Sequence, residues 1–105
     1  FTVNVPTPEL RKAVHVCGSK SRRDCDKLAE TGLPPIPSLH VAAPIIEQCA
    51  IHYECRTIHK NSVEPGALAK AVLKDCYRSG DFHTLYYGHI LGVLADDDAR
   101  ERLGV

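Results

Sequence analysis

Apolar residues recur at helical spacing along most of the chain, and the clearest instance is the stretch 44–60. At about 100° per residue, one side of a helix in this stretch collects mostly apolar residues, namely Ile46, Cys49, Ala50, Tyr53 and Thr57. A second side collects the polar and titratable residues Gln48, His52, Cys55 and His59. The pattern predicts an amphipathic central helix against which the remaining elements pack.

Start and stop signals predict the other helices. Thr7 can cap a helix that begins at Pro8, and Gly18 can end it. Similar signals predict helices within four further segments, namely 19–32, 62–79, 81–95 and 99–103. Only residues 1–5 alternate with the period of a strand. The sequence therefore predicts an all-α fold, a small bundle of five to six short helices in one domain that spans residues 1–105.

The segment 33–37 interrupts this helical pattern. Its sequence, Leu-Pro-Pro-Ile-Pro, holds three prolines, which remove backbone donors and fix an extended conformation. We expect an ordered proline-rich connector that crosses the surface of the domain.

The segment 81–95 is apolar on nearly all sides when it is drawn as a helix. A helix of that kind belongs in the interior, so this segment is expected to be the most buried one. Gly88 and Gly92 would lie on one face of it and let a second backbone approach closely.

Composition and charge narrow the class of protein. The chain has 105 residues, of which 44% are hydrophobic and 25% are charged, as in a folded globular domain. Thirteen basic residues balance thirteen acidic ones, so the chain has no excess positive charge to attract nucleic acid. The one basic cluster, Lys20, Arg22 and Arg23, is expected to be solvated surface. No apolar run reaches the ~20 residues of a membrane-spanning helix.

The cysteines favour an oxidising compartment. Five cysteines in so short a chain are typical of secreted domains that disulfides stabilise. The chain opens on Phe1 and contains no methionine, which suggests a mature product cut from a longer precursor. We therefore expect a secreted, processed protein.

Five is an odd number, so two internal disulfides would leave one thiol over. On a helix, Cys49 and Cys55 would be separated by a rise of ~9 Å, beyond the ~7 Å that a disulfide can bridge. The candidates for internal disulfides are Cys17, Cys25, Cys49 and Cys76. Cys55 is the candidate for a free or intermolecular thiol, and an intermolecular bond would give a disulfide-linked homodimer. The connectivity stays open.

One group of residues could bind a metal. His52, Cys55 and His59 would form a row along the helix and offer three ligands to a transition metal such as zinc. The fourth ligand could be His40, His83 or His89. Cys55 with a neighbouring histidine could also act as a nucleophile, but the sequence offers no oxyanion element, and it has no phosphate-binding motif.

These observations favour a protein that binds a partner over an enzyme. We expect no catalytic residue and no cofactor, and we expect a toxin-like or effector-like protein whose target is a protein or cell surface. A carrier or hormone-like role fits nearly as well. The alternative is an intracellular metal-binding or assembly module that uses His52, Cys55 and His59.

Overall fold

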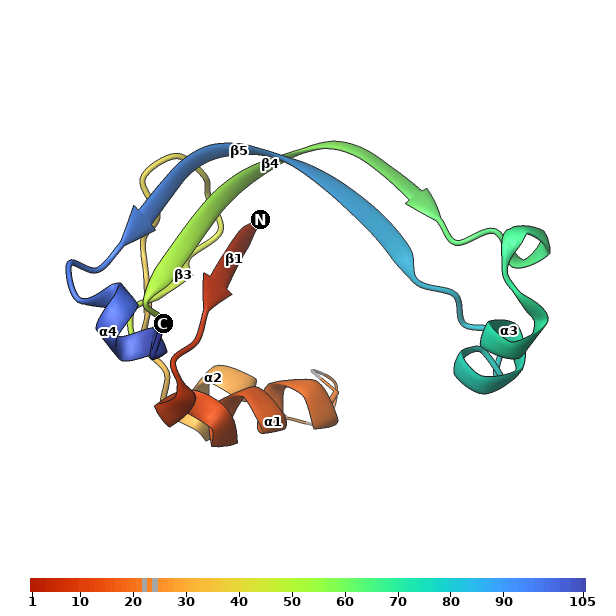
Figure 1. The fold of residues 1–105 in the computed structure, drawn as a ribbon, viewed down its shortest axis with the longest axis horizontal. Coiled ribbons are helices and arrows are strands. Elements are labelled where there is room, and N and C mark those ends of the chain that lie inside the picture. The colour runs from red at the N-terminus through yellow and green to blue at the C-terminus, as the bar shows by residue number, and fades with distance from the viewer. Residues whose placement is uncertain (22, 24) are drawn as a thin grey trace. The chain divides into compact units, whose positions relative to one another are not determined.

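A computed structural model describes residues 1–21, 23 and 25–105, and it shows a mixed α/β fold (Figure 1). Three strands, β1 (Thr2–Val5), β4 (Ile51–Ser62) and β5 (Thr84–Ala95), form one sheet in the order β1-β4-β5. β1 runs antiparallel to β4, and Thr2 is paired with Glu54. The expectation of an all-α bundle is therefore wrong, while the strand expected at residues 1–5 is confirmed.

The central helix expected at 44–60 is replaced by two strands. β3 (Ile45–Ile46) comes first, a turn follows, and β4 begins at Ile51. β4 contains the β-branched residues Ile51, Thr57 and Ile58 and the aromatic Tyr53, which lose side-chain freedom in a helix and fit well on a pleated sheet. The apparent helical period arose because some apolar spacings fit both periods over so short a stretch.

The segment expected to be the most buried helix is also a strand. β5 is rich in aliphatic and aromatic residues, and most of its positions are exposed rather than buried. Gly88 and Gly92 lie in this strand and do not form a helix-packing face. Tyr86 and Ile90 are among its exposed large side chains.

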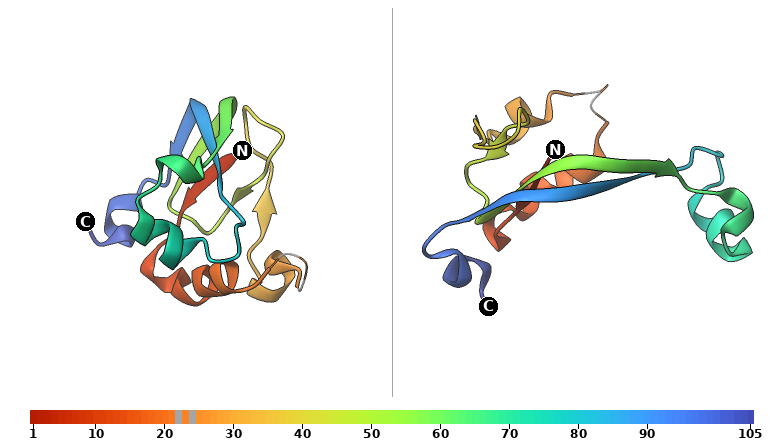
Figure 2. Two further views of the ribbon diagram at one scale, coloured as in Figure 1. Left: turned by 90° about the vertical axis from the view of Figure 1, so that its right-hand side faces the viewer. Right: turned by 90° about the horizontal axis from the view of Figure 1, so that it is seen from above.

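The helices are fewer and shorter than the sequence predicted. The 3-10 turn η1 (Pro8–Leu10) leads into α1 (Arg11–Ser19), and α2 (Lys27–Thr31) packs beside α1 (Figure 2). Later in the chain come the 3-10 turn η2 (Pro65–Ala67), α3 (Lys70–Cys76) and α4 (Ala99–Leu103). The helices expected after Pro8, within 19–32 and within 62–79 are confirmed in these shortened forms, and the helix expected at 99–103 is confirmed with the same bounds. Arg22, part of the expected basic surface cluster, lies outside the described residues.

The proline-rich connector is extended, as expected, and its centre is a strand. β2 (Pro35–Ile36) pairs antiparallel with β3, with Ile36 opposite Ile45. The backbone N–H of Glu47 donates to the carbonyl oxygen of Pro34 at 3.2 Å. The prolines therefore sit at an edge, where a missing donor costs nothing.

The chain divides into two compact units. The first comprises residues 1–56 and 90–105, and the second comprises residues 57–89. The buried residues belong to the first unit: Thr7, Ile45, Cys49, Ala50, His52, Glu54, Cys55 and Ala99. In the same unit the N-terminal ammonium group of Phe1 donates to the carbonyl oxygen of Cys55, and the N–H of Cys55 donates to the carbonyl oxygen of Phe1.

The expected disulfides are absent. All five cysteines lie in the described part of the chain, and each is a free thiol. The first unit is held instead by strand pairing and by a small core that includes the buried Cys49 and Cys55. Secretion stays a prediction, and the disulfides on which it rested are not formed. Among the described helices, none is long and apolar enough to cross a membrane.

Candidate functional site

A buried carboxylate on β4 holds a histidine from a neighbouring loop. Glu54 is completely inaccessible to solvent, the only fully buried charged side chain of the described residues. Its Oε1 accepts a hydrogen bond from the backbone N–H of His40 at 2.6 Å, and its Oε2 lies 3.4 Å from Nδ1 of the His40 ring. Both carboxylate oxygens therefore face one residue.

These contacts settle the charge of Glu54. Burial opposes ionisation, but hydrogen bonds from the backbone and ring of His40 and from the backbone of Leu39 outweigh it, so the pKa of the Glu54 carboxyl lies below its ordinary value. The group is a carboxylate at neutral pH and can only accept hydrogen bonds. In a neutral His40 ring, Nδ1 must then carry the hydrogen, and Nε2 keeps its lone pair.

The absence of a side chain at Gly92 leaves space for the His40 ring. A Cβ atom built on Gly92 of β5 would lie 2.8 Å from Cε1 and 2.9 Å from Nδ1 of that ring. Any side chain at this position would push the ring away. The His40 side chain is 48% exposed, so part of the ring is available to a ligand.

A second histidine is held inside the first unit. Oδ1 of Asn4 accepts from the backbone N–H of Ile46 at 3.0 Å and lies 2.9 Å from Nδ1 of His52. An amide oxygen is only an acceptor, so His52 Nδ1 donates. This buried network ties β1 to β3 and β4, and its role is structural.

The structure does not bring the expected metal ligands together. His52 and Cys55 are three residues apart on a strand, so alternation puts their side chains on opposite faces of the sheet. His59 belongs to the second unit, where its ring lies 5.3 Å from that of Tyr87. Among the described residues, no group of three or more histidines, cysteines or acids is placed to hold a metal. His52, Cys55 and His59 would form a row only on a helix, and this segment is a strand.

The histidines expected as a fourth ligand are also far from such a group. His40 is bound to Glu54, as described above. In the second unit, Nδ1 of His83 lies 2.7 Å from the hydroxyl of Tyr77, whose ring stacks on Phe82 with 4.9 Å between centroids. His89 is an exposed residue of β5. Each histidine has a separate setting.

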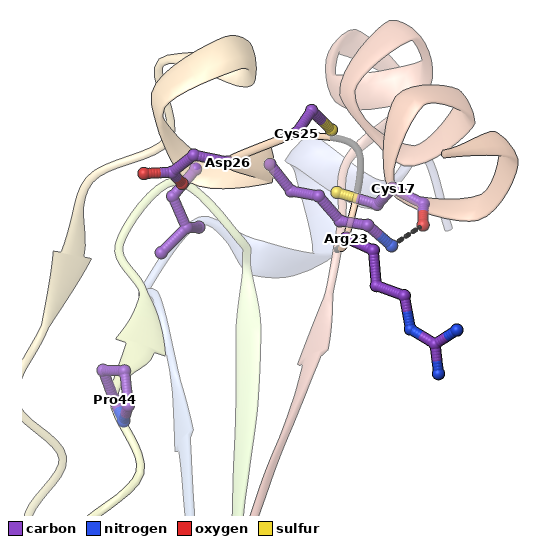
Figure 3. A pocket seen from close by; sticks show the side chains of 7 residues that line it. Cys17, Arg23, Cys25, Asp26 and Pro44 are labelled. Carbon is purple, nitrogen blue, oxygen red and sulfur yellow. Dashed lines mark hydrogen bonds between the residues drawn. The ribbon is translucent and has the colours of Figure 1, made fainter. Parts of the chain in front are cut away.

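Two cysteines and two cations line an open pocket of about 890 Å³ between α1, α2 and the residue that precedes β3 (Figure 3). Its lining residues are Cys17, Arg23, Cys25, Asp26, Lys27, Leu28 and Pro44. Nζ of Lys27 donates to the carbonyl oxygen of Cys17 at 2.6 Å. The pocket thus combines two cations and one carboxylate with thiols and an apolar wall.

The thiol of Cys25 is in its protonated form. Burial raises its pKa, and a hydrogen bond with Glu30 raises it further. Glu30 is itself paired with Lys20. Cys25 is therefore a weak nucleophile at neutral pH, because the thiolate is the reactive species.

Cys17 also borders a second cavity of about 300 Å³. That cavity is lined mainly by apolar side chains between β1, α1 and β3: Asn4, Pro6, Leu10, Ala13, Val14, Cys17, Leu33, Ile46 and Cys49. Burial raises the pKa of Cys49 as well. We assign this cavity to packing around the first helix.

Reasoning from the sequence missed the pair of His40 and Glu54. His40 had been considered only as a metal ligand, and Glu54 had no expected role. One signal was available: a carboxylate between Tyr53 and Cys55 is unusual at the centre of an apolar segment, and buried charges need partners. Finding its partner required the strand assignment for β4.

Comparison with known proteins identifies the fold. The model of the flavin reductase like domain family matches residues 1–104. An uncharacterised protein of Archaeoglobus fulgidus is 32% identical over 97 residues, which are 92% of this chain and 45% of that protein. Flavoredoxin of Desulfovibrio vulgaris (Miyazaki F) superposes with a TM-score of 0.68 at 26% identity, covering 93% of this chain and 43% of flavoredoxin.

A more distant structure agrees in fold alone. A Shewanella frigidimarina protein described as a flavin reductase with a split barrel domain has a TM-score of 0.67 at 16% identity, covering 92% of this chain and 41% of that one. The chain thus spans less than half the length of the relatives it matches.

These matches correct the functional expectations. The expected toxin-like or effector-like protein and the alternative metal-binding module are both wrong, because the match to a redox family covers nearly the whole chain. The expectation of a protein without enzymatic function is wrong for the same reason, because the family that matches residues 1–104 is described as a flavin reductase like domain. From its fold and from the match over residues 1–104, the chain belongs to the flavin reductase like domain family.

Proposed function

We propose that the protein containing this chain is a flavin-binding oxidoreductase, in which a flavin nucleotide accepts a hydride from a reduced nicotinamide nucleotide and passes the electrons on. The observation that carries the proposal is the family match over residues 1–104. The likeness to flavoredoxin, at 26% identity over 93% of the chain, supports it. A flavin supplies the hydride chemistry, and the protein supplies binding, orientation and electrostatics.

The chain offers groups of the kind that a flavin nucleotide requires. Arg23 and Lys27 outnumber Asp26 among the charged residues of the open pocket, and this excess of positive charge suits a phosphate group. Leu28 and Pro44 give the same pocket an apolar wall, which suits a flat aromatic ring. Because the chain spans 45% or less of its relatives' lengths, we propose that it provides part of the site.

The test uses the whole protein that contains this chain. It is purified without added flavin, and flavin mononucleotide is titrated in while the flavin fluorescence is recorded. We expect saturable binding, and under anaerobic conditions we expect reduced nicotinamide nucleotide to bleach the bound flavin. If flavin does not bind and does not stimulate oxidation of the reduced nicotinamide, the proposal is wrong.

A pair of variants tests the contribution of the pocket. Arg23→Ala removes a positive charge from the pocket, while Arg56→Ala removes one from an exposed position on β4 outside the pocket. We expect Arg23→Ala to weaken binding of flavin mononucleotide about tenfold, the effect of losing one charge-assisted contact. Riboflavin, which lacks the phosphate, should be affected much less. Equal losses in both variants would contradict a phosphate-binding role for this pocket.

A further inference from the structure

We infer that His40 and Glu54 form a preorganised acceptor site, in which Nε2 of His40 accepts a hydrogen bond from an N–H group of the flavin ring. The inference rests on the proposed function for the identity of the ligand. His40 would be the residue that touches the ligand, and Glu54 would be a positioning residue that acts through His40.

The first step of the argument is the cost of burying Glu54. A carboxylate with no exposed surface is unfavourable in a small domain unless its oxygens are satisfied. The backbone N–H of His40 satisfies Oε1, and Nδ1 of the His40 ring is the partner of Oε2. The buried charge therefore holds both the backbone and the ring of His40, and it fixes the orientation of the ring as well as the position of the loop.

The second step is the question of which nitrogen of the His40 ring carries the hydrogen. Glu54 can only accept hydrogen bonds, so it selects the tautomer of neutral His40 with hydrogen on Nδ1. Nε2, the other ring nitrogen, then carries a lone pair, and it lies 3.7 Å from the position of a Cβ atom on Gly92, farther than Cε1 and Nδ1 do. A fixed tautomer is what an acceptor for a ligand N–H requires, because an unpaired histidine would divide its population between two forms.

The third step is space. Cε1 and Nδ1 of the ring approach Gly92 so closely that a Cβ atom there would lie 2.8 Å and 2.9 Å away. The ring is therefore held between Glu54 and the backbone of β5, and its side chain is still 48% exposed. Among the described histidines, only this one combines a buried anionic partner with a half-exposed ring.

Glu54→Gln makes the inference testable by a change of tautomer. In this variant the amide oxygen must face the backbone N–H of His40, because that bond, at 2.6 Å, needs an acceptor. The amide NH₂ group then faces Nδ1 and donates to it. We expect the His40 tautomer to switch from mainly Nδ1–H to mainly Nε2–H, which would turn Nε2 from an acceptor into a donor.

The experiment is nuclear magnetic resonance of the whole protein with ¹⁵N-labelled histidine, at a pH about two units above the ordinary histidine pKa of about 6.5. The ¹⁵N shifts report the tautomer in the wild type and in Glu54→Gln. Flavin mononucleotide is then titrated in. We expect the Nε2 signal of His40 to move as flavin binds, and we expect Glu54→Gln to weaken flavin binding about tenfold, the loss of one hydrogen bond.

Two further variants keep the test decisive if Glu54→Gln does not fold. Gly92→Ala displaces the ring without altering Glu54, and it should also weaken flavin binding. His89→Gln, at an exposed position of β5, is the matched control and should bind flavin as the wild type does.

The outcomes separate the inference from the proposed function. Flavin binding with no change at His40, and with normal affinity in Gly92→Ala, would overturn the acceptor site and leave the flavin function intact. Complete failure to bind flavin would overturn both the proposed function and the ligand named here. A wild-type ring with hydrogen on Nε2 would overturn the preorganised geometry whatever the ligand.

Discussion

At the scale of single residues, the main feature is a charge that the sheet buries and satisfies. Glu54 lies at a position of β4 where an apolar residue would be expected, and it is tolerated because His40 and Leu39 supply donors to its oxygens. The charge was visible in the sequence. Its partner was not, because His40 lies 14 positions away in a loop and only the fold brings the two together.

Glu54 should make the stability of the protein depend on pH. Its pKa is lower in the folded state than in the unfolded state, so ionisation stabilises the folded protein above the unfolded pKa of about 4.3. That stabilisation is lost as the pH falls through the lower, folded-state pKa. Urea unfolding from about pH 7 to about pH 3 should show this loss in the wild type.

Glu54→Gln is the control for this prediction, because it has no charge to titrate. The pKa of Glu30 is also lowered, through its pairing with Lys20, but this contribution is common to both proteins and cancels in their difference. The difference in free energy of unfolding should therefore shrink at low pH. A difference that is constant over the whole range would contradict the assignment.

Gly92→Ala tests the packing of the His40 ring. The new Cβ would lie 2.8 Å from Cε1, so the ring must move, and it can move because it is half exposed. We expect the free energy of unfolding to change by less than about 1 kcal/mol. A crystal structure of the variant should show the ring displaced. An unmoved ring, or a loss of several kcal/mol, would mean that the ring is packed more rigidly than the structure shows.

At the scale of elements, the sequence predicted most of the helices and missed most of the sheet. The start at Pro8 and the acids near Ala99 were readable because such signals are local, although the side chains of Thr7 and Asp98 form no capping hydrogen bond. β4 and β5 were read as helices because their apolar residues are frequent enough to satisfy either period. Strand pairing such as Val3 with Tyr53 joins distant segments, and no local pattern records it.

The network around Asn4 is the element-scale feature that a mutation can test most directly. Asn4→Ala removes the acceptor of the Ile46 N–H and of Nδ1 of the buried His52. Leaving buried donors unsatisfied should cost about 2 kcal/mol or more in free energy of unfolding. Urea denaturation measures it, and Asn4→Asp, which keeps an acceptor oxygen at the same position, should lose less. Equal losses in both variants would exclude the acceptor role.

At the scale of the whole molecule, the redox state of the cysteines distinguishes the disulfide-stabilised protein that the sequence predicted from the protein with free thiols that the structure shows. Five cysteines in 105 residues indicated disulfides, whereas the structure has five free thiols in different settings. Cysteine content alone cannot distinguish these cases, because a buried thiol is a good small core residue. Cys49 and Cys55 fill that role, at 5% and 4% exposure.

Alkylation of the native protein without reductant should reveal these settings as different rates. Cys76 is exposed on α3, so it should react first. Cys49 should react slowly, because it is buried and its pKa is raised, which lowers the fraction of reactive thiolate. Cys55 is equally buried and should be protected as well, which argues against its serving as the thiol of a disulfide-linked dimer.

After denaturation, intact mass should show that all five cysteines of the chain have been alkylated. A protein in which four cysteines resist alkylation even when it is unfolded would contain two disulfides, and the hydrogen-bonded, thiol-containing core described here would then be wrong.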